Sequence, residues 1–395
     1  MTPYKHQVEI AQDAYSRLQD YGLVYLALEE RTGKTLTAIL VAEESKAQHI
    51  LVVTKKNALP GWQEHLGSYP VAKQYELINY HSLHKIKRHF DLVILDEAHN
   101  YVSSFPKPSK TWKTVRKFTT NKPIIYLSAT PYAQGPAWLF PQLALSDRSP
   151  WRSYKSYYEW FSHYGVPKSL WINMREVKQY TSVKDNEVLA DCNHLFITKT
   201  RQELGFEFEP RDELHTVSLS AETKSLINRI NSDRVCDMDG LRLVCDSIMK
   251  LRTALHMIEG GVAKIDDKYL ILDNTEKIQY IKETWGDSSE MAIMHNYVAE
   301  ETKLKAHFQN AAILQATRYA EGVDLSHFKH LIIYSQDFST ARHTQRRARQ
   351  ANKKRAEEIT VHYLLVKGGI SEQVYEAVSV NKQNYVDSLY QGVNL

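Results

Sequence analysis

Cysteine is scarce in this sequence, and several other familiar features are missing. The chain of 395 residues has three cysteines, Cys192, Cys236 and Cys245, and none belongs to a CxxC pair. This spacing suggests neither a zinc site nor a disulfide framework, and it favours a reducing cytoplasm. No apolar run approaches the roughly 18 residues of a membrane span, and the polar N-terminus lacks a signal-peptide core. We therefore expect a cytoplasmic protein with no membrane partner.

A strong charge of one sign is also missing. The 50 Lys and Arg residues are nearly balanced by 46 Asp and Glu residues, which leaves a formal net charge of +4. Such a small excess does not by itself demand a nucleic-acid partner, so the distribution of charge along the chain matters more. The length is sufficient for two or three domains with sizeable cores.

Strand-like and helix-like segments alternate in two parts of the chain. Short apolar, β-rich runs with helical patterns between them predict parallel strands that are covered on both faces. The runs lie at residues 23–28, 49–54, 91–95, 123–127, 291–294, 311–315, 331–334 and 359–365. We therefore expect an α/β protein with two lobes, at residues 1–135 and 216–395, the second ending in a helix that begins near Ser371.

Residues 136–215 differ in composition, because aromatic side chains crowd there. We interpret this segment as a helical insert between the two lobes. Aromatic side chains stack on the bases of single strands in some proteins, whereas Trp and Tyr elsewhere pack in a core. Both interpretations stay open from the sequence.

A first candidate site lies at residues 29–35, which read EERTGKT between a predicted strand and an apolar helix. Backbone N–H groups in such a loop favour anionic oxygens, so the context is typical of phosphate binding. Lys34 would reach the β- and γ-phosphates, and the Thr35 hydroxyl would ligate Mg²⁺. Leu28 stands where the first glycine of the GxxxxGK[ST] pattern belongs, and an ordinary helix start is the alternative. The residues assigned to the nucleotide are Arg31, Thr32, Gly33, Lys34 and Thr35.

Two adjacent carboxylates, Asp96 and Glu97, follow the apolar run at 91–95, and Ser128-Ala129-Thr130 follows the next run. Ligands of open parallel sheets lie beyond the carboxyl ends of the strands. Asp96 would therefore hold Mg²⁺, and Glu97 would orient or deprotonate an attacking water. The hydroxyl residues at 128–130 would hydrogen-bond the acidic pair. The alternatives are a solvated loop and a turn segment.

In their order and spacing, residues 33–35, Asp96-Glu97-Ala98-His99 and residues 128–130 resemble motifs I, II and III of superfamily 2 helicases. The resemblance implies two RecA-like lobes that use ATP and Mg²⁺. Residues 4–7, 51–64 and 78–83 are similar to segments of the Swi/Snf branch, and Gln7 would then recognise adenine. The compact size and the sequence RTGKT resemble those of phage members of this group. A phage-encoded protein would be located in the cytoplasm of the host cell.

The resemblance extends into the second lobe through residues 317–325, which look like motif V. In the family pattern, Gly322 allows a close backbone approach and Asp324 contacts the ribose or the partner lobe. Arg318 would lie on the nucleic-acid track. A glycine-containing turn between two strands is the alternative for this segment.

Residues 345–350 are similar to motif VI, which in the family brings an arginine to the γ-phosphate. Gln345 and Arg349 match its pattern. Asn352 stands where the family has a second arginine, so Arg346 or Arg355 is the alternative finger.

Basic side chains are concentrated at residues 341–355, where seven occur with no acidic residue. A charge run is usually a solvated face. Lys353 and Lys354 are not assigned to ATP and would contact nucleic-acid phosphates without reading sequence. Lys55 and Lys56 follow a strand of the first lobe at a position that, in the family, lies on the nucleic-acid track.

The sequence thus predicts a monomeric, ATP-dependent translocase or helicase that acts on duplex, forked or branched DNA. DNA is preferred over RNA only through the resemblance to the Swi/Snf branch. An RNA-acting helicase and a binding module with a decayed ATPase are the alternatives. Lys34, Thr35, Asp96 and Glu97 argue against decay, while Leu28 and Asn352 argue for it.

Overall fold

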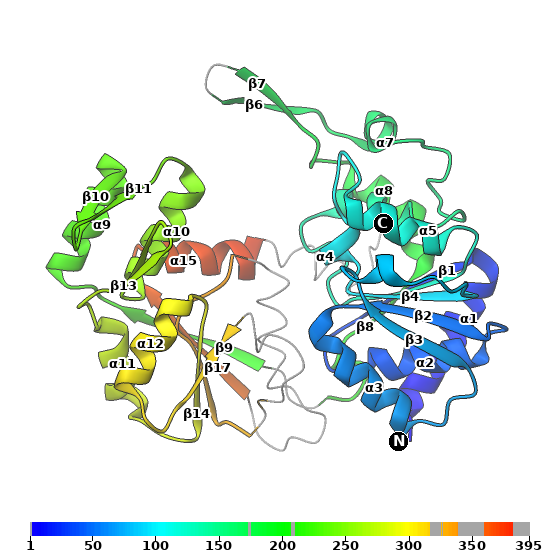
Figure 1. Ribbon diagram of the computed structural model, residues 1–395, viewed down its shortest axis with the longest axis horizontal. Coiled ribbons are helices and arrows are strands. Elements are labelled where there is room, and N and C mark those ends of the chain that lie inside the picture. Colours follow the sequence, from blue (N-terminus) through cyan, green and yellow to red (C-terminus); the bar gives the residue numbers. More distant parts are fainter. Residues whose placement is uncertain are drawn as a thin grey trace. The chain divides into compact units, whose positions relative to one another are not determined.

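The computed structural model describes residues 2–172, 175–206, 210–316, 325, 327–338 and 359–381. Within these residues the chain divides into two compact units, the first extending to Gly205 and the second beginning at Phe206 (Figure 1). The sequence placed its boundaries at 135/136 and 215/216. The division differs because the aromatic segment packs into the same hydrophobic core as the first sheet.

The first unit is built on a six-stranded sheet in which all paired strands run parallel. In order across the sheet, its strands are β3 (Gln74–Asn79), β2 (His49–Thr54), β4 (Leu92–Asp96), β5 (Ile124–Leu127), β1 (Leu23–Leu28) and β8 (Phe196–Lys199). Every residue of β1 and β5 is buried, which explains why these strands read as continuous apolar runs.

One helix precedes the first strand, and further helices and 3₁₀ turns connect the strands. They are α1 (Lys5–Tyr21), α2 (Lys34–Glu44), the 3₁₀ turn η1 (Lys56–Ala58), α3 (Leu59–Ser68), η2 (Leu83–Lys85), α4 (His99–Val102) and α5 (Lys110–Thr119). The strand order sets the carboxyl ends of β1, β5, β4 and β2 beside one another. The loops that follow these four strands therefore meet at one edge of the sheet.

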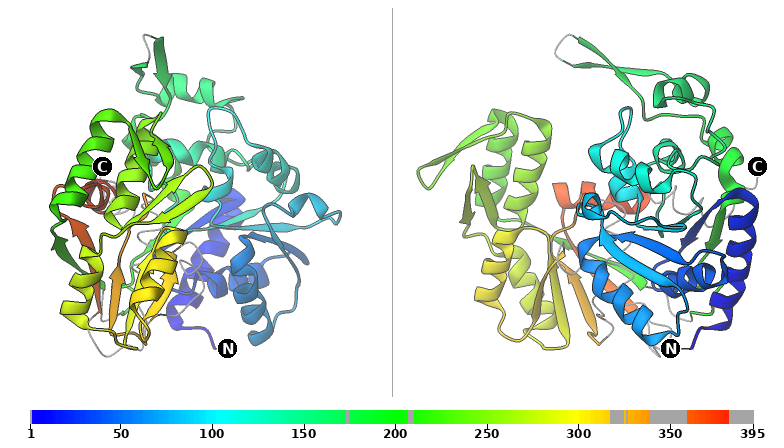
Figure 2. Two further views of the ribbon diagram at one scale, coloured as in Figure 1. Left: turned by 60° about the vertical axis from the view of Figure 1, so that its left-hand side comes forward. Right: turned by 45° about the vertical axis from the view of Figure 1, so that its right-hand side comes forward.

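The aromatic segment is only partly helical. It comprises η3 (Pro136–Trp138), α6 (Leu139–Leu143), α7 (Tyr157–Tyr164), the antiparallel hairpin β6 (Lys168–Ile172) and β7 (Arg175–Gln179), α8 (Asp185–Cys192) and η4 (Asn193–Leu195). The hairpin, green in Figure 2, extends away from the body of the first unit. Trp151 and Trp160 are at most 2% exposed and belong to the core, so the core-packing interpretation holds for them.

The second unit contains a five-stranded sheet, also parallel throughout its pairings. Its strands, in order, are β15 (Ala312–Gln315), β14 (Met291–His295), β16 (His330–Ile333), β17 (Ile359–Val366) and β9 (Pro210–Val217). Alternate residues face two apolar clusters, for example Ile332 on one face and Leu331 on the other. Both faces of the sheet are therefore covered.

Helices and two small hairpins complete the described part of the second unit. They are α9 (Ala221–Asp233), β10 (Val235–Met238), β11 (Leu241–Val244), α10 (Ile248–Glu259), β12 (Val262–Ile265), β13 (Lys268–Ile271), α11 (Glu276–Trp285), α12 (Val298–His307), α15 (Ile370–Tyr375) and the π-helical η6 (Glu376–Asn381). None of the described helices has the length and apolarity needed to cross a membrane.

The eight predicted strands are confirmed to within one residue at each end. The two parallel sheets with flanking helices are the α/β RecA-like lobes expected from the sequence. The predicted helix near Ser371 exists, but Ser371 is not its cap. Gly369 holds that position, and the Ser371 hydroxyl instead accepts a hydrogen bond from the backbone N–H of Val366.

Candidate active site

The loop between β1 and α2 has the backbone of a tight anion-binding turn. Gly33 caps α2 with φ of 84°, and Arg31 also has a positive φ of 66°. The ammonium group of Lys34 donates to the carbonyls of Leu28 and Glu29, both at 2.8 Å. Lys34 thus folds back over its own loop, and Leu28, the departure from the usual glycine, supplies one of its acceptors.

Gln7 reaches this loop from α1. Its amide nitrogen donates to the Gly33 carbonyl at 3.3 Å, and its oxygen accepts from the Tyr4 backbone at 2.8 Å. A Cβ atom at position 33 would lie 2.0 Å from the Gln7 amide, so only glycine fits there without displacing Gln7. The structure therefore brings Gln7 into contact with the loop. The resemblance assigns the two to different parts of ATP, Gln7 to the adenine and the loop to the phosphates.

Asp96 lies at the carboxyl end of β4 and is held by two donors. Its Oδ2 accepts from the Thr54 hydroxyl at 2.7 Å and from the Trp62 indole at 3.0 Å. Both hydrogen bonds are thus made to the same carboxylate oxygen. The side chain of Asp96 is half-buried. Carboxylate oxygen of this kind is the ligand that Mg²⁺ prefers, so the residue fits its predicted role as a metal ligand.

Glu97 is buried and belongs to a triangle of polar side chains. Its Oε2 lies 3.2 Å from the Ser128 hydroxyl and 3.4 Å from Nδ1 of His99, and Ser128 and His99 are 3.0 Å apart. A positive φ of 51° at Glu97 places this carboxylate beside the end of β5. The predicted hydrogen bond between the acidic pair and the residues after β5 is present, through Ser128.

His99 is neutral in this triangle. Burial, together with the nearby charge of Lys55, lowers its pKa to about 3. A neutral imidazole can share a proton with Ser128 without repelling the cations of a nucleotide site. The same electrostatic effect relates His99 to Lys55, which was predicted to contact nucleic acid. The neighbouring Lys56 is exposed at the start of η1.

Arg201 is a member of the site that the sequence did not reveal. It is 5% exposed, follows β8, and lies 3.7 Å from the carboxylates of both Glu29 and Glu30. Its backbone N–H also donates to Glu29 at 2.6 Å. Burial lowers the pKa of Lys34, and the charge of Glu30 opposes that shift. Arg201 and Lys34 therefore share the acidic residues of the phosphate loop.

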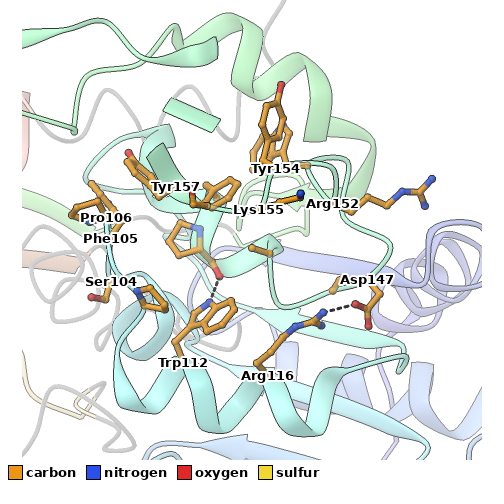
Figure 3. A pocket seen from close by; sticks show the side chains of 17 residues that line it. Ser104, Phe105, Pro106, Trp112, Arg116, Asp147, Arg152, Tyr154, Lys155 and Tyr157 are labelled. Carbon is orange, nitrogen blue, oxygen red and sulfur yellow. Dashed lines mark hydrogen bonds and ion pairs between the residues drawn. The ribbon is translucent and has the colours of Figure 1, made fainter. Parts of the chain in front are cut away.

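A separate pocket of about 510 Å³ lies among the aromatic side chains of the first unit (Figure 3). Trp112 borders it and donates from its indole to the Pro141 carbonyl at 2.7 Å, and Arg116 pairs with Asp147. Phe105 stacks on Tyr157 with ring centroids 4.5 Å apart. None of these residues belongs to the predicted nucleotide site, so the pocket is distinct from it.

Most second-lobe predictions fall outside the described residues. They are Arg318, Gly322, Asp324, Gln345, Arg346, Arg349, Lys353 and Lys354. They lie at positions 317–324 and 339–358 of the chain. The described site therefore consists of first-unit residues.

Comparison with known proteins gives two matches and one negative result. Residues 63–133, which include Asp96, Glu97 and Ser128, match the family described as "Type III restriction enzyme, res subunit". The SWI2/SNF2 ATPase core domain of Sulfolobus solfataricus matches with a TM-score of 0.44 and 15% identity, covering 100% of this chain and 92% of that chain. No curated protein matches the sequence.

Proposed function

We propose that this protein is an ATPase of the superfamily 2 helicase/translocase type that is stimulated by nucleic acid and moves along DNA. One observation carries the proposal. The phosphate-loop lysine, the paired carboxylates and Ser128 follow three adjacent parallel strands, β1, β4 and β5, at one edge of the sheet. The family match over residues 63–133 supports the same assignment for the acidic segment.

Each first-unit residue has a role that its surroundings permit. Lys34 would exchange its two carbonyl acceptors for phosphate oxygens. Asp96, oriented by Thr54 and Trp62, would hold Mg²⁺ together with the Thr35 hydroxyl, and the ion would neutralise phosphate charge. Glu97 would accept a proton from water while Ser128 fixes its carboxylate. ATP supplies the phosphoryl group whose transfer to water drives movement.

The direct test measures ATP turnover without nucleic acid and with single-stranded DNA, duplex DNA, forked DNA or RNA. We expect turnover that rises with DNA and is abolished by Lys34→Ala. Lys46→Ala is the matched control, because Lys46 is an exposed lysine that follows the same helix. Near-normal turnover in Lys34→Ala would remove the phosphate-loop assignment. Stimulation by RNA alone would replace DNA as the substrate.

A further inference from the structure

Four polar side chains form a row on one face of the second sheet. Glu213 and His215 lie on β9, His362 on β17, and His330 begins β16. These strands are neighbours, and the register sets His362 opposite Glu213. Figure 1 shows β9 and β17 side by side. The row interrupts an apolar face, because residues two positions further along the same strands pack in the core beneath α11.

Donor atoms of three of these side chains converge on one point. The Nε2 of His215 lies 3.0 Å from the Nδ1 of His362. Carboxylate oxygens of Glu213 lie 3.6 Å from each of these nitrogens. A tetrahedral Zn²⁺ with ligands at about 2.0–2.2 Å sets its donor atoms roughly 3.3–3.6 Å apart. The two distances to Glu213, which involve its two different oxygens, lie at the upper end of this range, and the two nitrogens would separate by a few tenths of an ångström to bind the ion.

The second nitrogen of each imidazole is occupied by a partner. His215 Nδ1 lies 3.0 Å from the Tyr280 hydroxyl, and His362 Nε2 lies 3.3 Å from Nδ1 of His330. Metal-binding histidines use their outer nitrogen in this way, because the contact fixes ring orientation and tautomer.

We propose that Glu213, His215 and His362 bind one divalent transition-metal ion, for which Zn²⁺ is the best match. Two imidazoles and one carboxylate suit zinc, and the 55% exposed side chain of Glu213 gives access from solvent. The ligands lie in the middle of β9 and β17, away from the strand ends that lead into the second-lobe motifs. The bound ion would therefore hold the edge strand β9 to its sheet.

The same contacts also suit a metal-free chain of hydrogen bonds from Tyr280 through His215 and His362 to His330. Calorimetric titration of the full-length, chelator-treated protein with Zn²⁺ distinguishes the two. The metal site predicts one Zn²⁺ per chain, a rise in Tm with Zn²⁺, and visible absorption bands when Co²⁺ is added instead. A wild-type protein that binds no stoichiometric Zn²⁺ overturns the proposal.

Variants show whether this cluster is the binding site. Glu213→Gln should weaken Zn²⁺ binding at least tenfold, and His215→Gln should abolish it. Tyr280→Phe removes only an outer contact, for which a loss of about 10–100-fold in affinity is expected. Glu222→Gln and His327→Gln are matched controls on exposed residues of the same unit. Because Glu213 is exposed, its variant should fold normally, and unchanged Zn²⁺ binding in that variant rules the site out.

Discussion

The carboxyl-terminal edges of the two parallel sheets carry polar side chains of different kinds. In the first unit, Lys34 and Asp96 lie half-buried at this edge, beside the buried Glu97. In the second unit, the corresponding edge buries its charges. Lys277 is 2% exposed and donates to the Tyr334 carbonyl at 2.9 Å, while Glu300 is fully buried and accepts from Ser335 and from two backbone N–H groups.

The polar groups at the edge of the first sheet are accessible to a ligand, whereas the charged groups at the edge of the second sheet are enclosed. Burial raises the pKa of Glu300 to about 7, and it lowers the pKa of Lys277. Groups enclosed in this way are held by internal partners and are poorly accessible to a ligand. Within the described residues, the proposed nucleotide site therefore belongs to the first unit. The contribution predicted for the second unit lies in residues 317–325 and 345–350, which resemble motifs V and VI.

Arg349→Ala tests that division with the largest expected effect. If motif VI supplies the arginine that offsets transition-state charge, turnover should fall by about 10³–10⁵-fold while ATP binding changes little. Single-turnover hydrolysis and nucleotide affinity would be measured on the same sample. Arg346→Ala and Arg355→Ala are the necessary controls, because Asn352 leaves the finger open to either. Normal hydrolysis by all three would leave the first unit acting alone.

Glu97→Gln sharpens the assignment within the first unit. The amide keeps the shape of the side chain but cannot accept the proton, so turnover should fall by about 10²–10⁴-fold. Nucleotide affinity should persist, since Lys34 and the loop are untouched. Equilibrium binding of a fluorescent ATP analogue checks the second point. Lost binding with persistent hydrolysis would show that the roles given to Asp96 and Glu97 are wrong.

Arg201→Met tests whether the acidic residues of the phosphate loop depend on a cation from β8. Removing one partner of a buried ion pair leaves an uncompensated charge, and we expect about 3 kcal/mol of lost stability. Urea denaturation measures this change. Arg242→Met is the control, because its pair with Asp237 is about two-thirds exposed and should contribute less than about 1 kcal/mol. Equal losses would make the Arg201 pair an ordinary surface contact.

Replacing Lys353 and Lys354 by Ala should have the smallest effect. Each lost phosphate contact lowers the slope of log K against log salt by about 0.9 on duplex DNA. Two lost contacts should flatten the slope accordingly and leave sequence preference unchanged. Fluorescence anisotropy across a salt series provides the measurement. A slope that does not change would make the basic run a solvated face.

The sequence predicted the central strands because buried parallel strands are apolar along their whole length. The edge strand β3, which reads QYELIN and is only partly buried, escaped prediction because its pattern is less apolar. Local motifs likewise led to the prediction of Lys34, Asp96 and Glu97 as site residues, and the structure places all three at one edge of the sheet. Arg201 could not be found in this way, since only the pairing of β8 with β1 brings it to a loop some 170 residues earlier.

The row of histidines in the second unit was missed for a similar reason. His215 and His362 are separated by 147 positions, and neither belongs to a spaced metal-binding motif. Their approach depends on the pairing and register of β9 and β17, and β9 was not predicted. The spacing of the cysteines therefore gave no indication of the proposed metal site, because its ligands are two histidines and a glutamate.

Trp62 would give the proposed magnesium site of the first unit an optical reporter. Its indole N–H donates to the same Asp96 oxygen that accepts from Thr54, and the ring is 1% exposed. Indole emission depends on the electrostatic field around the ring. A cation arriving at Asp96 would withdraw electron density from that oxygen and shift this field. Intrinsic fluorescence, compared with that of a Trp62→Phe variant, would therefore follow magnesium binding in real time without an added label.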